Sequence, residues 1–257
     1  MSEYYFVTTL LPELRIGDTS ELAGEEFEFT LEQNLTERDL HKITILRRHV
    51  DIENIRLFWQ GAPLEPGGNF DEKAIEANLL TRKGLPQYVF DYMKKYEESR
   101  ERLSHFGELL SAYFEQETKE NRGFVRAWLQ FELTSRLIFV TLRSKSLGRT
   151  LPAPVTSEVP ENDSFGFPLE QKEELPPHPL ELYRPLQAIF ESNRSNPLAL
   201  HHALLQWKFD HIEEMCGPNP FHVNRIFSYV LRLILAEKWL RLDKKKGLQF
   251  VEKVGIA

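Results

Sequence analysis

The chain has 257 residues, 41% hydrophobic and 28% charged, a balance that is typical of a folded protein and excludes wholesale disorder. Its 32 Lys and Arg against 39 Asp and Glu give a net charge of −7. That charge disfavours nucleic acid as the main partner, because duplex binding requires a basic surface. The one cysteine, Cys216, excludes an internal disulfide framework and is typical of a reducing compartment.

The N-terminal segment contains an apolar run from Tyr4 to Leu11, which predicts either a short buried strand or an opening helical turn. No basic residue precedes this run and Pro12 ends it, so it does not have the pattern of a secretory signal. No run in the chain approaches the ~20 apolar residues that a membrane span needs. We therefore expect a cytoplasmic protein without a membrane span of its own.

Helical periodicity runs through most of the remaining chain. Residues 25–35 predict a short helix, although Phe27, Phe29 and Leu31 alternate as in a strand. Thr36 to Gly61 predicts one long helix with Thr36 as its N-cap and Gly61 as its stop. Further helices are expected over residues 71–83, 87–120, 126–148, 180–191, 197–215 and 226–247. Asn69 or Asp71 is the expected cap of the first of these, and the second is expected to break near residues 99–104. Asn219 is the expected cap of the last helix, and a short closing piece is expected to follow it over residues 248–254.

Residues 150–179 differ from the rest of the chain. They contain seven prolines and no sustained periodicity, which indicates a functional loop or a mobile linker. We expect N-terminal helical lobes over residues 1–149, this Pro-rich segment, and a C-terminal helical lobe over residues 180–257. With so few strand signals, the predicted fold class is all-α, built from helical hairpins.

The three long helices share a pattern that predicts an internal repeat. Each has a broad apolar face, an acid in its middle with an Arg about one turn later, and a closing Gly. The copies lie roughly 90 to 100 residues apart, which favours a threefold repeat of lobes. The alternative is that such helices are generic, since glycine stops are common. We expect the acid and the Arg of each helix to fix helix packing or to contact a partner. The alternative is that they form ordinary ion pairs without a further role. These residues are Glu53 and Arg56, Glu132 and Arg136, and Glu237 and Arg241.

Catalytic and cofactor motifs do not occur in the sequence. There is no P-loop, dinucleotide-binding glycine motif, Cys-x-x-Cys or His-Glu-x-x-His, so we expect no enzyme activity, no cofactor and no metal. The densest set of metal-capable groups supports only a less favoured alternative, a metal-dependent all-α enzyme, because the Glu-x-x-His pairs of a bundle metal site are missing. That set is His201, His202, His211 and Glu214.

Four segments carry a resemblance to a known family. VDIENIRLFWQG, RAWLQFELTSRLIFVTLRSKSLG and YVLRLILAEKWLRLDKKKGL, with the opening EYYFVTTLLPEL, resemble a bacterial family similar to a shortened rotor-adaptor subunit of V/A-type rotary ATPases, the subunit lettered C, or d in eukaryotes. The resemblance implies a threefold-repeated helical fold without catalytic residues. It also implies an adaptor on the cytoplasmic face of the membrane, whose partners are the membrane rotor ring and the central-stalk subunits of a V-type ATP synthase.

The chain departs from this family in one respect. It is shorter than the usual rotor-adaptor subunit, and residues 150–179 fall where a further helical pair is expected, which puts a complete threefold fold in doubt. The alternative function is that of a soluble helical scaffold that binds another protein.

Overall fold

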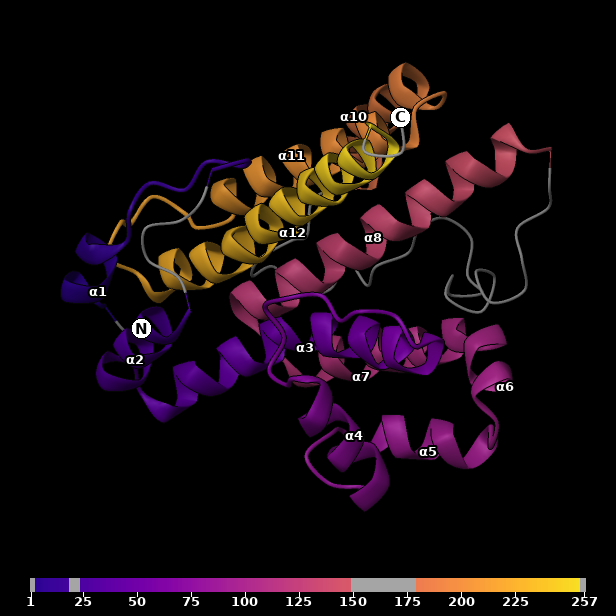
Figure 1. Ribbon diagram of the computed structural model, residues 1–257. Helices are drawn as coiled ribbons and strands as arrows, with labels where there is room; N and C mark the ends of the chain where they lie inside the picture. The colour runs from indigo at the N-terminus through magenta and orange to yellow at the C-terminus, as the bar shows by residue number, and fades with distance from the viewer. Residues whose placement is uncertain (1–2, 19–23, 149–178, 255–257) are drawn as a thin grey trace. The chain divides into compact units, whose positions relative to one another are not determined.

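The computed structural model describes residues 3–18, 24–148 and 179–254 of the chain (Figure 1). Within these ranges the regular elements are eleven α-helices, together with one isolated β-bridge between Glu3 and His222. The all-α prediction is therefore confirmed. The helices are α1 (Tyr5–Leu10), α2 (Glu25–Asn34), α3 (Glu37–Gln60), α4 (Glu72–Thr81), α5 (Gln87–Lys95), α6 (Ser99–Ser104), α7 (Phe106–Glu120), α8 (Gly123–Ser146), α10 (Pro179–Asn193), α11 (Pro197–Glu214) and α12 (Val223–Val254).

The chain divides into two compact units, which cut across the parts expected from the sequence. Both ends of the chain belong to unit 1, so that α1 and α2 share a core with α12. The Pro-rich loop predicted over residues 150–179 lies outside the described residues except for Pro179, which begins α10, and the threefold repeat stays a prediction. Unit 1 contains residues 1–51, 65–69 and 201–257, and unit 2 contains residues 52–64 and 70–200.

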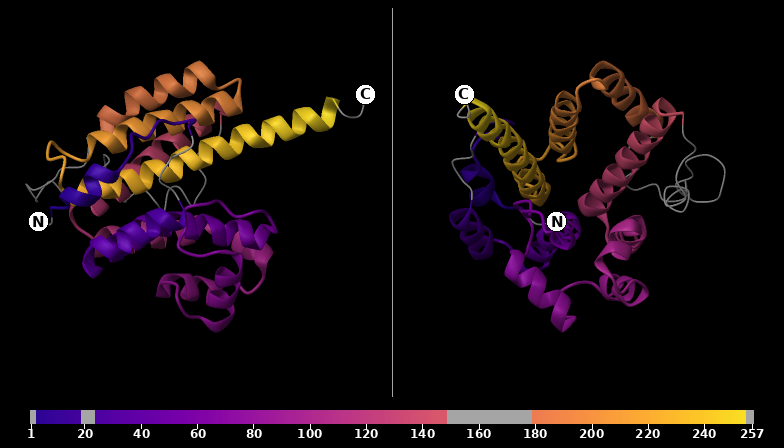
Figure 2. Two further views of the ribbon diagram at one scale, coloured as in Figure 1. Left: turned by 60° about the vertical axis from the view of Figure 1, so that its left-hand side comes forward. Right: turned by 45° about the vertical axis from the view of Figure 1, so that its right-hand side comes forward.

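Unit 1 is built around the first half of α12. Residues 226–231 are buried on every side of this helix, as expected for a helix that is enclosed by others. The ring of Phe27 on α2 lies 5.3 Å from the ring of Tyr229. Ser228 donates a hydrogen bond of 3.1 Å to the carbonyl oxygen of Ile212 on α11, so α11 and α12 lie side by side (Figure 2).

Unit 2 is centred on α8, which packs against both α7 and α10. Phe131 of α8 is fully buried. The rings of Phe139 on α8 and Phe190 on α10 are 5.5 Å apart in an edge-to-face arrangement, which aromatic pairs prefer. On the α7 side, the Tyr88 hydroxyl donates to a carboxylate oxygen of Glu117 at 3.1 Å, so this buried carboxylate has a hydrogen-bond donor.

Several helix ends follow their local sequence signals. Asp71, rather than Asn69, caps α4 by accepting a hydrogen bond of 2.8 Å from the Ala74 amide. Gly61 and Gly148 adopt φ of +64° and +60° just beyond α3 and α8, as the predicted glycine stops require.

The predicted limits of the last helix are wrong at both ends. α12 begins at Val223, and Asn219 bonds to its own turn instead of capping the helix, because its side chain accepts from the Phe221 amide at 3.0 Å. At the other end α12 continues through Gly247 to Val254, so residues 248–254 are not a separate piece. A glycine inside a helix costs only about 1 kcal/mol relative to alanine, and its helix-forming neighbours offset that cost. None of the described helices combines the length and the apolar character needed to cross a membrane.

Candidate interaction surface

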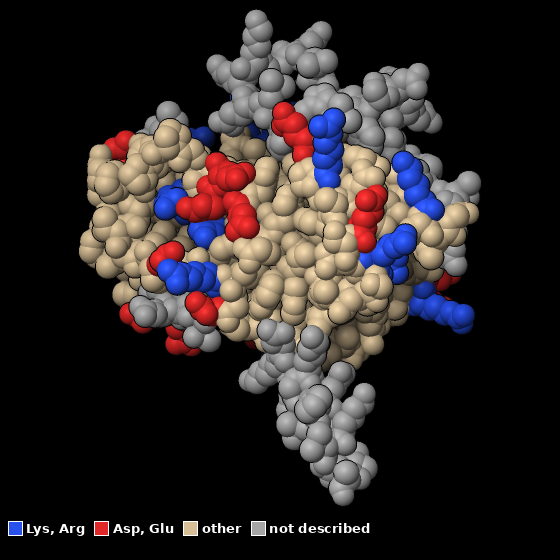
Figure 3. Space-filling view, turned by 90° about the horizontal axis from the view of Figure 1, so that it is seen from above, with Lys and Arg blue, Asp and Glu red and all other residues tan. Residues whose placement is uncertain are grey.

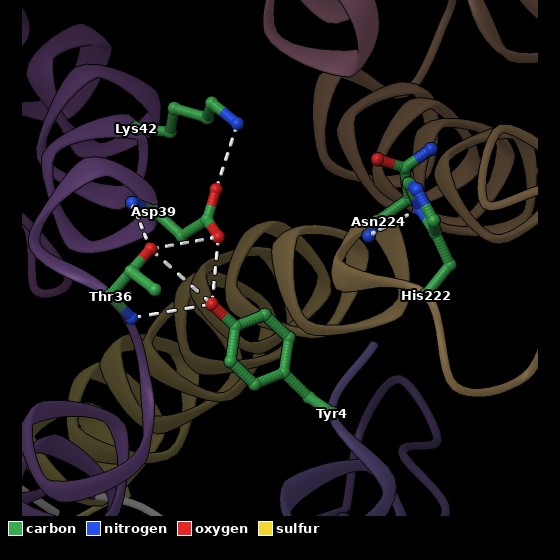
Figure 4. Close-up of polar contacts among 6 residues, drawn as sticks. All are labelled: Tyr4, Thr36, Asp39, Lys42, His222 and Asn224. Carbon is green, nitrogen blue, oxygen red and sulfur yellow. Dashed lines mark hydrogen bonds and ion pairs between the residues drawn. The ribbon is translucent and has the colours of Figure 1, made fainter. Parts of the chain in front are cut away.

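The short helix α1 is anchored to unit 1 by the tyrosine that precedes it. The Tyr4 hydroxyl donates to the Asp39 carboxylate at 2.7 Å and accepts from the Thr36 amide at 3.2 Å (Figure 4). Thr36 is the N-cap of α3, because its hydroxyl oxygen accepts from the Asp39 amide at 3.3 Å, as predicted. Tyr4 therefore closes the first turn of α3 with a side chain that is distant in sequence.

The carboxylate at the centre of this anchor is buried and ionised. Asp39 is 2% exposed, and its other oxygen accepts from Lys42 Nζ at 2.8 Å. Burial by itself would raise the pKa of Asp39, but the hydrogen bonds from Lys42 and Tyr4 outweigh burial and hold the pKa below its ordinary value. The N-terminus of α3 also favours a negative charge at this position.

The loop that leads into α12 holds the other side of α1. The Tyr4 amide donates to the Phe221 carbonyl oxygen at 2.8 Å, and the ring of Tyr5 lies 4.6 Å from the ring of Phe221. Asn219 donates to the Glu3 carboxylate at 3.2 Å, and Val7 of α1 is buried at 1% exposure. A six-residue helix is unstable alone, so these contacts are what holds α1 in place.

The outward side of α1 is apolar. Tyr5, Phe6 and Leu10 are 57%, 62% and 47% exposed, and we refer to these three side chains as the N-terminal apolar surface. Single exposed apolar residues are common on proteins, but three on one six-residue helix are a concentration. α1 therefore presents large apolar side chains to solvent from a fixed position.

The neighbouring helix α2 adds an exposed aromatic ring with acids around it. α2 packs against α1, as Figure 1 shows, and its buried residues are Phe27 and Leu31. Phe29 points outward and is 63% exposed. The exposed acids of α2 one turn from Phe29 are Glu25, Glu26 and Glu32, and these four side chains are called the acidic face of α2 below.

Four of the six predicted packing or interaction residues lie in unit 2. Glu53 and Arg56 form an ion pair of 2.7 Å within α3, and Arg136 of α8 reaches to 3.8 Å from the same Glu53. Glu132 lies on α8 and is partly exposed. Arg136 of α8 thus lies beside Glu53 of α3, and the role of these residues in helix packing or toward a partner stays a prediction.

The other two predicted residues, Glu237 and Arg241, lie in unit 1 and have partners that their spacing did not indicate. Arg241 is 3.8 Å from Glu65. Burial raises the pKa of Glu237, and the charge of Arg47 opposes that rise. Arg47 also holds Glu28 of α2 through two hydrogen bonds of 2.8 and 2.5 Å.

The histidine-rich set of α11 does not assemble into one site. His202 stacks on the ring of Trp239 at 4.0 Å, and His211 lies 3.5 Å from Glu214. Burial lowers the pKa of His201 to about 4, so it is neutral near pH 7. Across the described ranges no three His, Cys, Asp or Glu side chains lie close enough together to hold a metal ion. The three histidines therefore have different local contacts, and Nε2 of His201 is buried without a hydrogen-bond partner among the described residues.

Charged side chains are interspersed on the visible surface. On the face drawn in Figure 3, Lys and Arg alternate with Asp and Glu in small mixed groups, and uncharged surface separates the groups. No continuous basic area lies among the described residues of this face.

The N-terminal apolar surface and the acidic face of α2 were missed by the sequence analysis, although α2 carried a signal. Phe27 and Phe29 are two residues apart, which on a helix places them about 200° apart around the axis. Once residues 25–35 are taken as a helix, only one of the two rings can point into the core. The other ring is then expected on the surface, as the structure shows for Phe29.

Comparison with known proteins places the whole chain in one family. A family model described as "Protein of unknown function (DUF2764)" matches residues 1–255. A protein of Chlamydia muridarum (strain MoPn / Nigg) is 24% identical over 261 residues, covering 98% of this chain and 97% of its own length. A protein of Chlamydia trachomatis serovar D is 24% identical over 268 residues, covering 100% and 99%, and one of Chlamydia pneumoniae is 22% identical over 264 residues, covering 99% and 98%. All three carry the name "Uncharacterized protein". No solved structure matches the chain.

These matches correct the resemblance inferred from the sequence. The family that covers nearly the entire chain is DUF2764, and neither it nor the Chlamydia relatives is named as a component of a V/A-type ATPase. The resemblance to the rotor-adaptor subunit is therefore wrong. It rested on four segments, and three of them are long amphipathic helices with glycine stops, which are generic features of helical proteins.

Proposed function

The chain belongs to the DUF2764 family, whose description names no activity, and from the geometry of unit 1 we propose that it is a non-catalytic helical protein that binds another protein through the N-terminal apolar surface. The observation that carries this proposal is the exposure of Tyr5, Phe6 and Leu10 on a helix that is fixed in place. Apolar side chains held outward are the usual core of a protein interface.

The energetics of α1 support this function. Complete burial of a Leu or Phe side chain stabilises by about 1.5 to 3 kcal/mol relative to full exposure. Phe6 and Leu10 retain about half of that gain for a partner, because each is roughly half exposed. The anchor through Tyr4 matters as much, since a preformed helix loses little conformational entropy on binding.

The ionisable groups of both units support a non-catalytic role. Glu53, Arg56 and Arg136 are paired with one another, and Arg47 is paired with Glu28. Carboxylates and guanidinium groups in such pairs stabilise helix packing and are not poised for proton transfer. A cytoplasmic location is part of this proposal, and the experiment below identifies the partner.

A site-specific photocrosslinker tests the proposal in the cell that makes this protein. A photoreactive residue replaces Thr9, which is exposed on α1 beside the N-terminal apolar surface, and is activated by light. We expect one covalent adduct with a second protein, and we expect Phe6→Ser to reduce its yield about tenfold. The matched control replaces Thr81 on α4, an exposed threonine that, like Thr9, bonds to the carbonyl four residues before it.

Two outcomes of this experiment contradict the proposal. One is the same adduct from position 81 as from position 9, which indicates random contact. The other is an adduct from position 9 whose yield does not depend on Phe6. Mass spectrometry of the adduct identifies the partner, and so also decides whether the expected central-stalk or rotor-ring proteins take part.

A further inference from the structure

The acids of α2 differ in how the fold uses them. Glu28 is partly buried, and Arg47 holds it through two hydrogen bonds inside unit 1. Glu25, Glu26 and Glu32 are exposed, and within the described part of the chain no Lys or Arg forms an ion pair with them. α2 contains no basic residue. The acidic face of α2 therefore carries three carboxylates that unit 1 leaves facing solvent.

The position of Phe29 among these acids is set by the helix itself. Glu25 and Glu26 precede Phe29 by four and three residues, and Glu32 follows it by three, so all three lie next to its ring on the helix surface. An exposed aromatic ring surrounded by negative charge is suited to an apolar group that is flanked by positive charge. The ring supplies buried area, and the carboxylates supply orientation and charge complementarity.

The charge of this face excludes several occupants. A second copy of the chain docked by the same face would bring three carboxylates against three more, and the whole chain carries a net charge of −7. Like charges across an interface cost several kcal/mol. Anionic lipid headgroups and nucleic acid are repelled for the same reason. A partner that carries Lys or Arg beside apolar residues is the occupant that gains from both parts of the surface.

We propose that the protein bound by this surface presents a basic amphipathic helix, whose apolar stripe covers Phe29 and the N-terminal apolar surface and whose Lys or Arg side chains pair with Glu25, Glu26 and Glu32. This inference rests on the proposed function and specifies the chemistry of its partner. A helix of this kind docks by placing apolar residues at three- and four-residue spacing onto an apolar surface. The cationic side chains beside that stripe then meet the carboxylates of α2.

Peptide binding to the full-length protein tests the inference. The probe is a fluorescent 18-residue helical peptide with Leu along one face and Lys elsewhere, and the matched peptide has Glu in place of every Lys. Anisotropy titrations are run in about 20 mM and about 500 mM salt. The Debye length falls from about 20 Å to about 4 Å between them, so high salt weakens binding that depends on charge and leaves binding that depends on apolar contact. The single variants are Phe29→Ser and Phe6→Ser. The triple variant of α2 is Glu25→Gln, Glu26→Gln and Glu32→Gln, and the control triple variant is Glu72→Gln, Glu76→Gln and Glu97→Gln.

The control triple variant removes the same charge from exposed positions of unit 2, so both triple variants have a net charge of −7 + 3 = −4. We expect the α2 triple variant to bind the Lys peptide about tenfold more weakly in low salt and within about twofold of the natural protein in high salt. The control triple variant should stay within about twofold throughout, and Phe29→Ser should weaken binding about tenfold in both salts. The Glu peptide should not bind.

Specific outcomes overturn the inference. Equal weakening by both triple variants shows that only overall charge matters. Equal binding of the Glu and Lys peptides, or no saturable binding of the Lys peptide below about 1 mM, shows that the partner is not basic. If Phe29→Ser and Phe6→Ser weaken both peptides while the glutamate variants do not, the proposed function survives and the partner class fails. If the Lys peptide binds without dependence on either Phe, the proposed surface itself fails.

Discussion

Removing one hydroxyl from the anchor of α1 should loosen this helix measurably. In Tyr4→Phe, the Asp39 carboxylate loses a hydrogen bond of 2.7 Å and the Thr36 amide loses its bond of 3.2 Å. A hydrogen bond to a charged group contributes about 1.5 to 3 kcal/mol and a neutral one about 0.5 to 1.5 kcal/mol. Asp39 keeps the Lys42 and Thr36 side chains as donors, so we expect a loss near the lower end of the sum, about 2 to 3 kcal/mol.

The pH dependence of this loss has a definite sign. The pKa of Asp39 is lowered in the folded protein, so the stability it contributes is present above its unfolded pKa and is lost as the pH falls through its folded pKa. The difference between Tyr4→Phe and the natural protein should therefore be largest near pH 7. Below about pH 4 it should shrink toward that of a neutral hydrogen bond, about 1 kcal/mol.

Hydrogen exchange of the α1 amides measures the local opening of this helix, and urea unfolding measures the free energy of unfolding of the protein. Tyr5→Phe is the matched control, because its hydroxyl bonds only the exposed Glu3 and its loss should change stability by less than about 0.5 kcal/mol. Tyr4→Phe should increase the exchange of the Thr8, Thr9 and Leu10 amides, which donate to carbonyl oxygens one turn earlier, by about 30- to 150-fold, which corresponds to about 2 to 3 kcal/mol. Equal exchange in the two variants would refute the reasoning that Tyr4 holds α1 in place.

Three further predictions concern the interiors of the two units. Burial raises the pKa of Glu237 in the folded protein, so its carboxyl group destabilises the fold increasingly as the pH rises through the folded pKa. Urea unfolding should therefore show that Glu237→Gln stabilises the protein more at about pH 8 than at about pH 4. Burial also raises the pKa of the Cys216 thiol, so iodoacetamide should label it at least about 100-fold more slowly in native than in unfolded protein. Phe131→Ala should lower the free energy of unfolding by about 3 to 5 kcal/mol, whereas Phe29→Ser should change it by less than about 0.5 kcal/mol. If urea unfolding shows comparable losses of free energy for the two variants, the burial of Phe131 and the exposure of Phe29 are contradicted.

The features that could be predicted from the sequence are those that short stretches of chain determine. Thr36 caps α3 and Gly61 ends it, because a cap needs only a side chain and an amide three residues away, and a stop needs only a positive φ. Gly247 carries the same signal, but α12 continues through it. A glycine permits a helix to end without forcing it to do so.

The features that could not be predicted depend on residues that are distant in sequence. Tyr4 meets Asp39 across 35 positions, and Glu3 meets Asn219 across 216 positions. Nothing in the local pattern of either segment specifies these pairs. The candidate surface follows from them, because α1 turns Phe6 outward only when Tyr4 and Val7 are held against unit 1.

Family membership could not be predicted from the helices for a related reason. The three long helices with their acid, Arg and glycine positions share features that many amphipathic helices have. In the structure their charged groups serve different contacts. Arg136 reaches Glu53 on another helix of unit 2, whereas Arg241 reaches Glu65 in unit 1. Similar spacing within each helix therefore does not imply a similar environment.

Covalent footprinting inside living cells tests the central claim most directly. A small carbene reagent labels exposed side chains, and the labelling of Phe6 and Phe29 is compared between purified protein and protein in its own cells. Leu80 on α4 serves as the internal reference, because it is 77% exposed and lies in unit 2. A partner over α1 and α2 should lower the labelling of Phe6 and Phe29 about threefold or more relative to Leu80 in cells. Unchanged labelling of both rings in cells would contradict the claim that this surface is a binding site.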